Sequence, residues 1–415
     1  MPDVIVPVTW VQQETTYFCG PAAAQMALAS LGAAQPATPP PWQEQLWADV
    51  QARTNEARPA AAGPGTPDCP AFPTQRCEKV QWDWKCWSTT PPALERVLNL
   101  RQSRATCAVS THPTERAATR ALLDAIDAGI PGVALVFGWQ HWLVVDGYLH
   151  DPTASSTNVG HRHVDGVYLR DSNAEEALHY VTWTRWTDDY LRFVPAGTYR
   201  DTIVVIGAVP RPVSPPSPPQ APDNVRIGTQ AGGGQMAKMA RRNLAVLITA
   251  EEAVHRAQTA AQELLRRSDR WRIALVSADP GTPLCVQRLD LDDSYYYIVP
   301  YRIKTRETAR LIVDAATGQF TDAGGIETHD ASLAPYVDPV AALERYHGRS
   351  LELPGVGKRI IRPGTVGHHP VAVWKPCRQS TSPSSPFFQM SVGDRLVYLS
   401  ADGRKWFDAL TTGIA

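Results

Sequence analysis

Long apolar runs are missing from this sequence, since no stretch approaches the roughly 18 uninterrupted apolar residues of a membrane-spanning helix. The N-terminus also lacks the basic and then apolar segments of a secretory signal peptide. An excess of one charge is absent too, because 40 Lys and Arg face 41 Asp and Glu. Bulk electrostatics therefore favour neither nucleic acid nor an anionic membrane as a partner. We expect a cytoplasmic protein, with export by a route that needs no such signal left open.

Cysteine is scarce, with seven residues in a chain of 415. An odd number leaves at least one thiol unpaired, and seven is too few for a disulfide scaffold of this size. Cys69, Cys77 and Cys86 cluster in a Pro- and Trp-rich stretch, where a disulfide, or a metal site with Cys107 and His112, is one interpretation. The spacing matches no C-x-x-C zinc motif, so we expect no metal and no other cofactor. The pairing state of these cysteines stays open.

Proline marks the clearest boundary in the chain. The run from Pro210 to Pro219 predicts an extended, polyproline-like spacer. At about 150 residues a domain, the length suggests two or three folded units. We therefore expect a first domain at residues 1–209, a linker at 210–223, and two smaller units at 224–330 and 331–415. The second half is expected to fold separately and to contribute no residue to a site in the first half.

Residue patterns in the first half predict helices followed by strands. A helix is expected from Cys19 to Leu31, since Pro21 suits the first turn and Gly32 follows the last. An amphipathic helix is expected at 114–128, and strands at 133–137, 141–148, 166–170, 180–184 and 202–208. Gly138-Trp139-Gln140 separates the first two strands and is a hairpin signature. Helices before an antiparallel-looking sheet indicate the α+β class.

The second half contains two similar stretches. Candidate strands at 295–303, 309–314 and 318–320 are echoed by those at 387–392, 395–399 and 403–407. The spacing from Arg310 to Gly318 equals that from Arg395 to Gly403. An amphipathic helix candidate precedes each copy, at 250–267 and 338–347. Internal duplication of a helix-plus-sheet module is the simplest account, with chance similarity of hairpins as the alternative.

Cys19 lies where a loop is predicted to become a helix. Backbone N–H groups and the positive end of the helix dipole stabilise a thiolate there, which makes the cysteine a better nucleophile. Taken alone, a cysteine is more often a small buried hydrophobe. Gln13 favours the interpretation of Cys19 as a nucleophile, because its side-chain amide can form an oxyanion hole together with the Cys19 N–H. The adjacent Gln12 is a weaker candidate by register.

A thiolate nucleophile needs a base, and His141 opens an apolar strand that would hold it rigidly. The alternative interpretation is a core histidine that caps the hairpin. An acceptor that orients His141 is expected on a neighbouring strand, and Asp171 ends the strand at 166–170. Asp151 and Asn173 are the competing candidates.

Together these motifs resemble the C39-like branch of the papain-fold cysteine peptidases, over about residues 1–208. The resemblance is carried by Gln13 and Cys19-Gly20-Pro21-Ala22-Ala23, by Gly129-Ile130-Pro131-Gly132-Val133, and by His141-Trp142-Leu143-Val144-Val145-Asp146-Gly147-Tyr148. It implies a papain-like domain in which an N-terminal helix with Cys19 packs on an antiparallel sheet with His141. It also implies that Gln13 belongs to the oxyanion hole.

The resemblance leaves the orienting acid open. The family usually has an Asp-Pro shortly after the histidine. Asp151-Pro152 keeps this dipeptide but comes early, whereas Asp171-Ser172 ends a strand without the proline. We prefer Asp171, because an inserted loop at 154–164 would bring the strand at 166–170 beside the His141 strand.

The sequence thus predicts a papain-like α+β peptidase domain followed by an α+β region with internal duplication. The predicted activity is thiol-dependent cleavage of a peptide or protein substrate through an acyl-enzyme on Cys19, with His141 as base and acid. An acyl transferase or deamidase would use the same residues, and a non-enzymatic binding protein is the third interpretation. The second half faintly resembles PepSY-type modules, which implies a recognition or inhibitory role.

Overall fold

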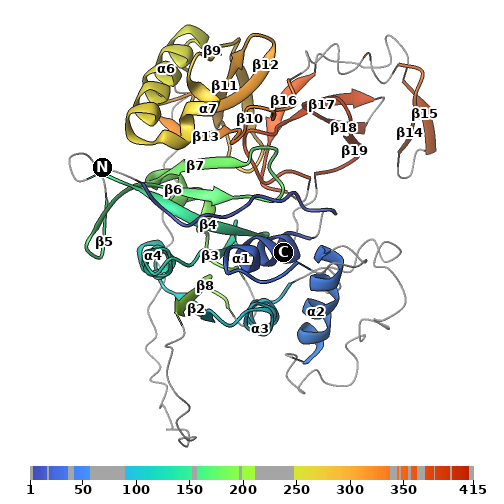
Figure 1. The fold of residues 1–415 in the computed structure, drawn as a ribbon. Helices are drawn as coiled ribbons and strands as arrows, with labels where there is room; N and C mark the ends of the chain where they lie inside the picture. The colour runs from blue at the N-terminus through green and yellow to red at the C-terminus, as the bar shows by residue number, and fades with distance from the viewer. Residues whose placement is uncertain are drawn as a thin grey trace, which may run out of the picture.

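The structure, a computed structural model, describes residues 3–15, 18–35, 42–56, 89–151, 157–195, 199–210, 247–336, 344, 347–353, 357–361, 370–377, 379–392 and 395–410. Seventeen strands, β1–β13 and β16–β19, belong to one sheet, and β14 (Ser350–Leu353) and β15 (Gly357–Ile360) form a separate hairpin. Figure 1 shows the first half of the chain in the lower part of the molecule and the second half above it.

This sheet contradicts the predicted fold class. The sequence indicates a papain-like domain, with an N-terminal helix on an antiparallel sheet, followed by a separate α+β region. The structure has instead one large mixed sheet of 17 strands that runs through both halves, with 36% strand against 27% helix. The prediction was wrong because pairing between distant strands depends on tertiary context, which local residue patterns do not encode.

The first half supplies strands β1 to β8. Their bounds are β1 Val4–Ile5, β2 Ala105–His112, β3 Gly132–Val136, β4 His141–His150, β5 Thr157–Val159, β6 Arg162–Arg170, β7 Leu178–Thr182 and β8 Ile203–Pro210. Antiparallel pairings give the order β2-β8-β3-β4-β6-β7, with β1 beside β4 and β5 beside β6. Because β4 and β6 are antiparallel neighbours, the start of β4 lies beside the end of β6.

Helices pack on this part of the sheet. They are α1 (Cys19–Ser30), α3 (Pro91–Arg101) and α4 (Glu115–Asp127), while α2 (Trp42–Glu56) packs on α1 and α3. α1 contacts β3 and β4, and its buried alanines allow close approach. α4 contacts β3, β4 and β8. In the described ranges, no helix is long and apolar enough to cross a membrane.

The ends of single helices agree with the sequence predictions better than the predicted relations between distant segments do. α4 begins after Thr114, whose hydroxyl accepts from the N–H of Ala117, and it ends before Gly129, which has a φ of 76°. The stretch 154–164, interpreted as an inserted loop, contains a hairpin of β5 and β6 that turns at Gly160 with a φ of 66°. Residues 152–156 of that stretch lie outside the described residues.

Two four-stranded sets make up most of the second half. The first set is β10 Leu284–Arg288, β11 Tyr295–Ile303, β12 Arg306–Asp314 and β13 Phe320–Gly325; the second is β16 Val371–Trp374, β17 Phe387–Val392, β18 Arg395–Ser400 and β19 Trp406–Phe407. Within each set the strands are antiparallel and follow chain order. β10 and β16, the first strand of each set, pair in parallel. The strand pattern that repeats in the sequence therefore repeats in the sheet.

Shorter elements complete this half. β9 (Asp279–Pro280) pairs with β11, α6 spans Ala250–Arg267, and α7 spans Arg272–Leu275. The bounds of α6 match the predicted helix, while the helix expected at 338–347 lies almost entirely outside the described residues. The linker expected at 210–223 begins at the last residue of β8 and otherwise also lies outside them. The predicted domain limits remain predictions.

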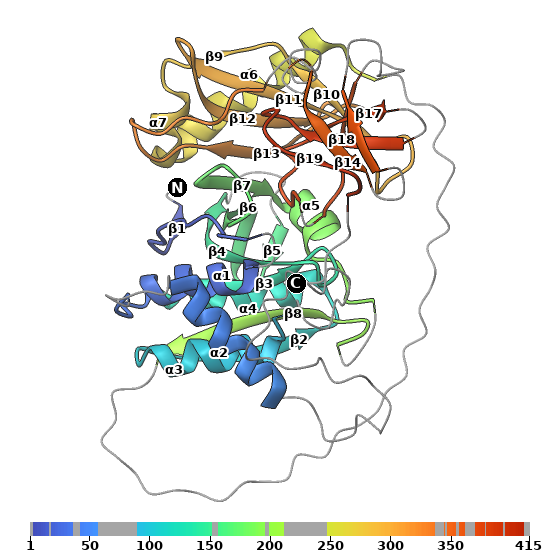
Figure 2. The same cartoon turned by 90° about the vertical axis from the view of Figure 1, so that its right-hand side faces the viewer.

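The halves are joined by pairing of β7 with β13 (Figure 2). The two strands are antiparallel, with Leu178 opposite Gly325 and Val181 opposite Asp322. One hydrophobic cluster crosses this junction, because it combines first-half residues with apolar residues of α6, α7 and β11 to β13; the first-half residues are Leu149, Tyr168, Leu178 and Tyr180. Sheet and core are therefore shared between the halves.

Buried ion pairs reinforce the same junction. Asp322 of β13 accepts from Arg185 at 3.1 Å, and Arg288 of β10 pairs with Asp189 at 2.8 Å. Arg185 ends the short helix α5 (Trp183–Arg185), and Asp189 belongs to the π-helical turn that follows it, Trp186–Tyr190. Removing one partner of such a pair leaves a buried charge uncompensated, which is strongly destabilising.

A fragment that ends at Pro210 should therefore be poorly soluble. It leaves β7 as an open edge and uncovers the first-half residues of the shared cluster, two features that favour association. We expect residues 1–210 to form larger particles than the full chain in size-exclusion chromatography with light scattering. A fragment that ends at Tyr336 keeps β13 and serves as the control. A well-folded, monodisperse 1–210 fragment with the stability of the full chain would contradict the shared core.

Candidate active site

Cys19 is the first residue of α1 and is only 5% exposed. Amides in a first helical turn have no intrahelical acceptor, and the helix dipole is positive there. Pro21 fits this turn because it needs no amide donor. Gly20 permits close packing on the segment before α3, since a Cβ at this position would lie 2.4 Å from Oγ1 of Thr89. The thiol is therefore held at the positive end of a tightly packed helix.

His141 is the first residue of β4 and follows a tight turn. Phe137, Gly138 and Trp139 in this turn all have positive φ, at 55°, 66° and 90°. Beyond the turn His141 pairs with Val136 of β3, and it is 2% exposed. The hairpin thus fixes both the backbone and the surroundings of the imidazole.

Asp171 follows the last residue of β6. Val144 of β4 lies opposite Arg170, so the antiparallel register brings Asp171 to the start of β4. Oδ1 of Asp171 accepts a hydrogen bond from Nε2 of His141 at 2.7 Å, and the carboxyl group is fully buried. The indole N–H of Trp10 donates to the backbone oxygen of Asp171 at 2.8 Å. Hydrogen bonds therefore fix the position of both the side chain and the backbone of Asp171.

Their mutual interaction favours the charged forms of both His141 and Asp171. Burial alone would lower the pKa of His141, but the negative charge and hydrogen bond of Asp171 outweigh it and raise that pKa above its ordinary value. A hydrogen bond with the Cys19 side chain acts in the same direction. Burial would raise the pKa of Asp171, yet the charge of His141 and the N–H of Asn173 keep it below its usual range. An imidazolium and a carboxylate are thus stable together at neutral pH.

The Cys19 thiol, the His141 imidazole and the Asp171 carboxylate follow one another in an order that suits nucleophilic catalysis. Nε2 of His141 is bound to Asp171, which leaves Nδ1 as the ring nitrogen available to Cys19. Cys19, His141 and Asp171, here called the candidate triad, then have the relation of nucleophile, proton carrier and orienting acid. Such an arrangement can form and break an acyl-thioester.

Gln13 lies in the segment before α1 and is fixed by Ser172. The Gln13 N–H donates to the backbone oxygen of Ser172 at 2.9 Å, and the Ser172 hydroxyl donates to Oε1 of Gln13 at 3.0 Å. An amide whose oxygen is bound in this way presents its NH₂ group as a donor. Gln12, the weaker candidate, is exposed, and its carbonyl accepts from Nε2 of Gln43 at 2.9 Å.

The structure separates Asp151 from His141. Asp151 follows the tenth and last residue of β4, so at roughly 3.3 Å per residue it lies about 30 Å from the start of that strand. Its carboxylate pairs instead with Arg267 of α6 at 2.8 Å. Asn173, the other competitor, uses its backbone N–H to donate to Oδ1 of Asp171 at 2.8 Å.

Thr381, in the second half, is a site residue that the sequence interpretation missed. Its hydroxyl donates to Oδ2 of Asp171 at 2.9 Å. The expectation that the second half contributes nothing to the site is therefore wrong. Trp10 and Ser172 were missed as well. The Ser- and Thr-rich run from Ser380 to Ser385 predicts a loop, but no sequence pattern predicts which segment of the chain that loop contacts.

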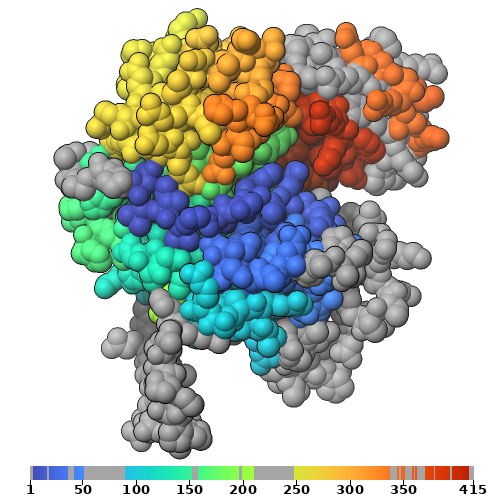
Figure 3. Space-filling view, viewed as in Figure 1, coloured from blue at the N-terminus to red at the C-terminus, as the bar shows by residue number. Residues whose placement is uncertain are grey.

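The N-terminal segment runs along the border between the halves, where Figure 3 shows it in dark blue beside the red C-terminal residues. Gln12 and Asn173 line a polar cavity of about 110 Å³ there, together with Gln379 and Ser380 of the second half. This cavity is thus lined by distant parts of the chain, and none of its lining residues belongs to the candidate triad.

The cysteine-rich stretch with Cys69, Cys77 and Cys86 lies outside the described residues. Cys107 and His112 are both in β2, where Nε2 of His112 hydrogen-bonds with the Ser110 hydroxyl at 2.9 Å. Burial lowers the pKa of His112. The cysteines that the structure describes form no disulfide.

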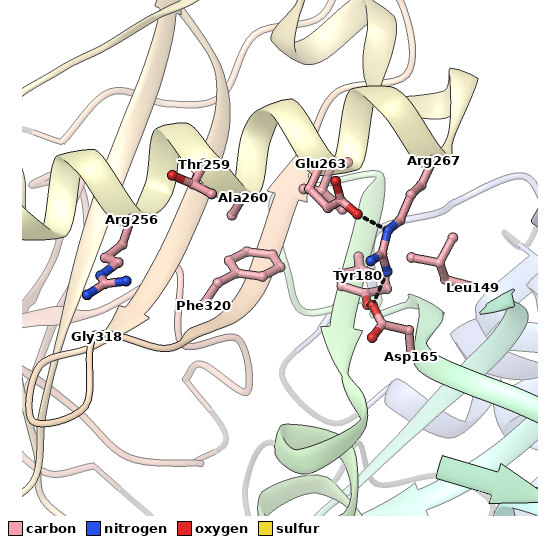
Figure 4. A pocket seen from close by; sticks show the side chains of 11 residues that line it. Leu149, Asp165, Tyr180, Arg256, Thr259, Ala260, Glu263, Arg267, Gly318 and Phe320 are labelled. Atoms are coloured by element: carbon pink, nitrogen blue, oxygen red, sulfur yellow. Dashed lines mark hydrogen bonds and ion pairs between the residues drawn. The ribbon is translucent and has the colours of Figure 1, made fainter. Parts of the chain in front are cut away.

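A more apolar cavity of about 270 Å³ lies under α6 (Figure 4). Phe320 and Tyr180 form one wall, with ring centroids 6.1 Å apart. Arg267 reaches across it to Asp165 at 2.8 Å, and Arg256 at the other end pairs with Glu252 at 2.7 Å. No residue of the candidate triad lines this cavity, so its volume gives no information on the chemistry at Cys19.

No family model, curated protein or solved structure matches this chain. The candidate active site therefore rests on its own geometry: a helix-start thiol, a buried histidine and a carboxylate in hydrogen-bonded sequence.

Asp171 and Asp151 should differ in their effect on turnover. We expect Asp171→Ala to lower kcat by at least tenfold more than Asp151→Ala, because only Asp171 contacts the imidazole and fixes its orientation. Asp151→Ala should instead lower thermal stability, since it leaves Arg267 of α6 without one of its carboxylates. Steady-state kinetics and thermal unfolding of both variants check this. Equal kcat values in the two variants would remove Asp171 from the orienting role.

Proposed function

We propose that this protein is a thiol-dependent peptidase in which Cys19 is the nucleophile. The observation that carries the proposal is the 2.7 Å hydrogen bond between His141 and the buried Asp171, together with an interaction of the Cys19 side chain with the same imidazole. A histidine that only capped a hairpin would have no need of a fully buried carboxylate and a cysteine at a helix start. The resemblance of the sequence motifs to C39-like cysteine peptidases points to the same activity.

The reaction proceeds through an acyl-enzyme. The Cys19 sulfur attacks the carbonyl carbon of a peptide bond while His141 carries the thiol proton. His141 then gives this proton to the departing amine, and the C–N bond breaks. In the second stage His141 takes a proton from water, the hydroxide attacks the thioester, and the proton returns to sulfur as the acid product leaves. Asp171 stabilises the imidazolium in both stages.

Gln13 supports the proposal as a donor to the oxyanion. Its amide oxygen accepts from the Ser172 hydroxyl, which leaves the NH₂ group as the donor of this side chain. With the Cys19 N–H it provides two donors for the tetrahedral intermediate. Peptides or proteins are the proposed substrates. The cytoplasmic location remains a prediction from the sequence.

Replacing the nucleophile tests the proposal directly. We expect Cys19→Ala to abolish hydrolysis of a fluorogenic peptide library without loss of folding, because the thiolate supplies the covalent step. Cys107→Ala is the matched control for hydrolysis, since Cys107 of β2 is also a buried thiol. Cys377 is the reference for labelling, because burial raises the pKa of its thiol to about 11. Iodoacetamide at pH 7 should label Cys19 faster than Cys377, as mass spectrometry of the peptides would show. Undiminished hydrolysis by a folded Cys19→Ala variant would exclude the proposal. Amide or ester products in place of acids would identify acyl transfer.

Gln13→Ala should lower kcat by about two to three orders of magnitude, the scale of one oxyanion donor. KM should change little, because the interaction is strongest in the transition state. Gln12→Ala is the neighbouring control, since that side chain is exposed and its carbonyl bond to Gln43 is retained. An effect of Gln13→Ala on KM alone would assign it to substrate binding.

A further inference from the structure

The carboxylate of Asp171 receives donors from both halves of the chain. Oδ1 accepts from Nε2 of His141 at 2.7 Å and from the N–H of Asn173 at 2.8 Å, both in the first half. Oδ2 accepts from the hydroxyl of Thr381 at 2.9 Å. Asp171 and Thr381 are 0% and 2% exposed, so water has little access to either group. Among the side chains that hydrogen-bond to Asp171 in the described residues, Thr381 is the donor to Oδ2.

Thr381 belongs to a loop, residues 379–386, that connects β16 to β17 and is here called the hydroxyl loop. Its first turn is closed by two backbone bonds between Cys377 and Ser380, at 3.0 and 3.2 Å. The hydroxyls of Ser382 and Ser384 lie 2.7 Å apart, and both side chains are buried. The loop is therefore internally ordered by its own polar groups.

Side chains from the first set of strands fix the hydroxyl loop in place. The Tyr296 hydroxyl donates to the backbone oxygen of Pro383 at 2.8 Å, and Nη1 of Arg310 donates to that of Ser384 at 3.1 Å. The Ser384 hydroxyl donates to Glu176, which lies in the same short segment as Asp171. The loop thus contacts the segment 171–177 at two points, one of which is the Asp171 carboxylate.

We propose that Thr381 is a positioning residue for the candidate triad, so that the second half of the chain completes the catalytic centre. A carboxylate held at Oδ2 cannot rotate away from His141 without losing a buried hydrogen bond to a charged group. The inference rests on the proposed function of the triad and adds to it a requirement: the hydroxyl loop must be docked for His141 to be correctly oriented.

Thr381→Val tests this, because it removes the hydroxyl while keeping the shape of the side chain. We expect kcat to fall about 10- to 100-fold, the scale of one hydrogen bond to a charged group. Thr381→Ser keeps the hydroxyl and should retain most of the activity. Thr308→Val is the control for a merely structural effect, since Thr308 is equally buried and donates to the backbone oxygen of Ala274 at 2.6 Å. Thr381→Ala replaces the valine variant if the latter does not fold.

The pH profile supplies a readout that lost stability alone would not move. The ionisable groups that act on this pair are Cys19 and, through Asp171, His179 and Tyr190. A misoriented Asp171 supports the imidazolium of His141 less. With iodoacetate, an anionic reagent that the imidazolium attracts, the alkaline limb of the rate of Cys19 alkylation should therefore move to lower pH in Thr381→Val. In an Asp171→Asn background the valine substitution should add no further effect, because Thr381 acts through the carboxylate.

The outcomes separate the two proposals. If Cys19→Ala abolishes turnover but Thr381→Val behaves like the unaltered protein in kcat and in the alkylation profile, the positioning role is wrong and the peptidase proposal stands. If no peptide is hydrolysed, the alkylation profile of Cys19 still decides the positioning role, because it requires no substrate. Equal losses in Thr381→Val and Thr308→Val, with unshifted profiles, would also overturn it.

Discussion

An ionised carboxylate with no access to water is stabilised by hydrogen-bond donors, and Asp171 has a donor at each of its two oxygens, which constrains the rest of the molecule. An ionised group in a protein interior is costly unless it is paired and hydrogen-bonded. His141 and Asn173 satisfy Oδ1, and Thr381 satisfies Oδ2. Because these donors come from β4, the segment after β6 and the loop after β16, the strands that carry them must keep a fixed relation. The shared sheet and the junction ion pairs provide that relation.

The junction itself combines apolar and ionic contributions. Pairing of β7 with β13 satisfies the backbone groups of two strands that would otherwise be edges. Arg185 and Arg288 bring positive charge to Asp322 and Asp189, and both guanidinium groups also lie over the ring of Trp374, at 5.9 and 5.5 Å from its centroid. Stacking on an aromatic face suits a desolvated arginine. Charges and rings of the two halves thus complement each other in specific pairs.

Local chemistry allowed good prediction of single elements. The bounds of α6 follow from Thr249, whose hydroxyl accepts from the N–H of Glu252, and from arginines in the last turn. The choice of Asp171 over Asp151 followed from the expected pairing of the strand at 166–170 with the His141 strand, and β6 does pair with β4. The loop expected before that strand is instead partly a hairpin. What the sequence could not predict is contact across the chain: β7 with β13, and Thr381 with Asp171. Such contacts depend on packing of surfaces that local periodicity does not describe. The separate papain-like domain failed for the same reason.

The separation of Asp171 and Thr381 in the sequence also determines when, during synthesis, their hydrogen bond can form. The two residues are 210 positions apart. At about 5–20 residues per second, a ribosome needs roughly 10 to 40 seconds to extend the nascent chain from one to the other. In the first part of that interval β7 has β6 beside it but lacks its second neighbour, β13, and until Thr381 is added the Asp171 carboxylate lacks one of its donors. A growing chain therefore carries Cys19 and His141 long before their carboxylate is fully held, so the thiol centre reaches its final geometry only after the hydroxyl loop has been made.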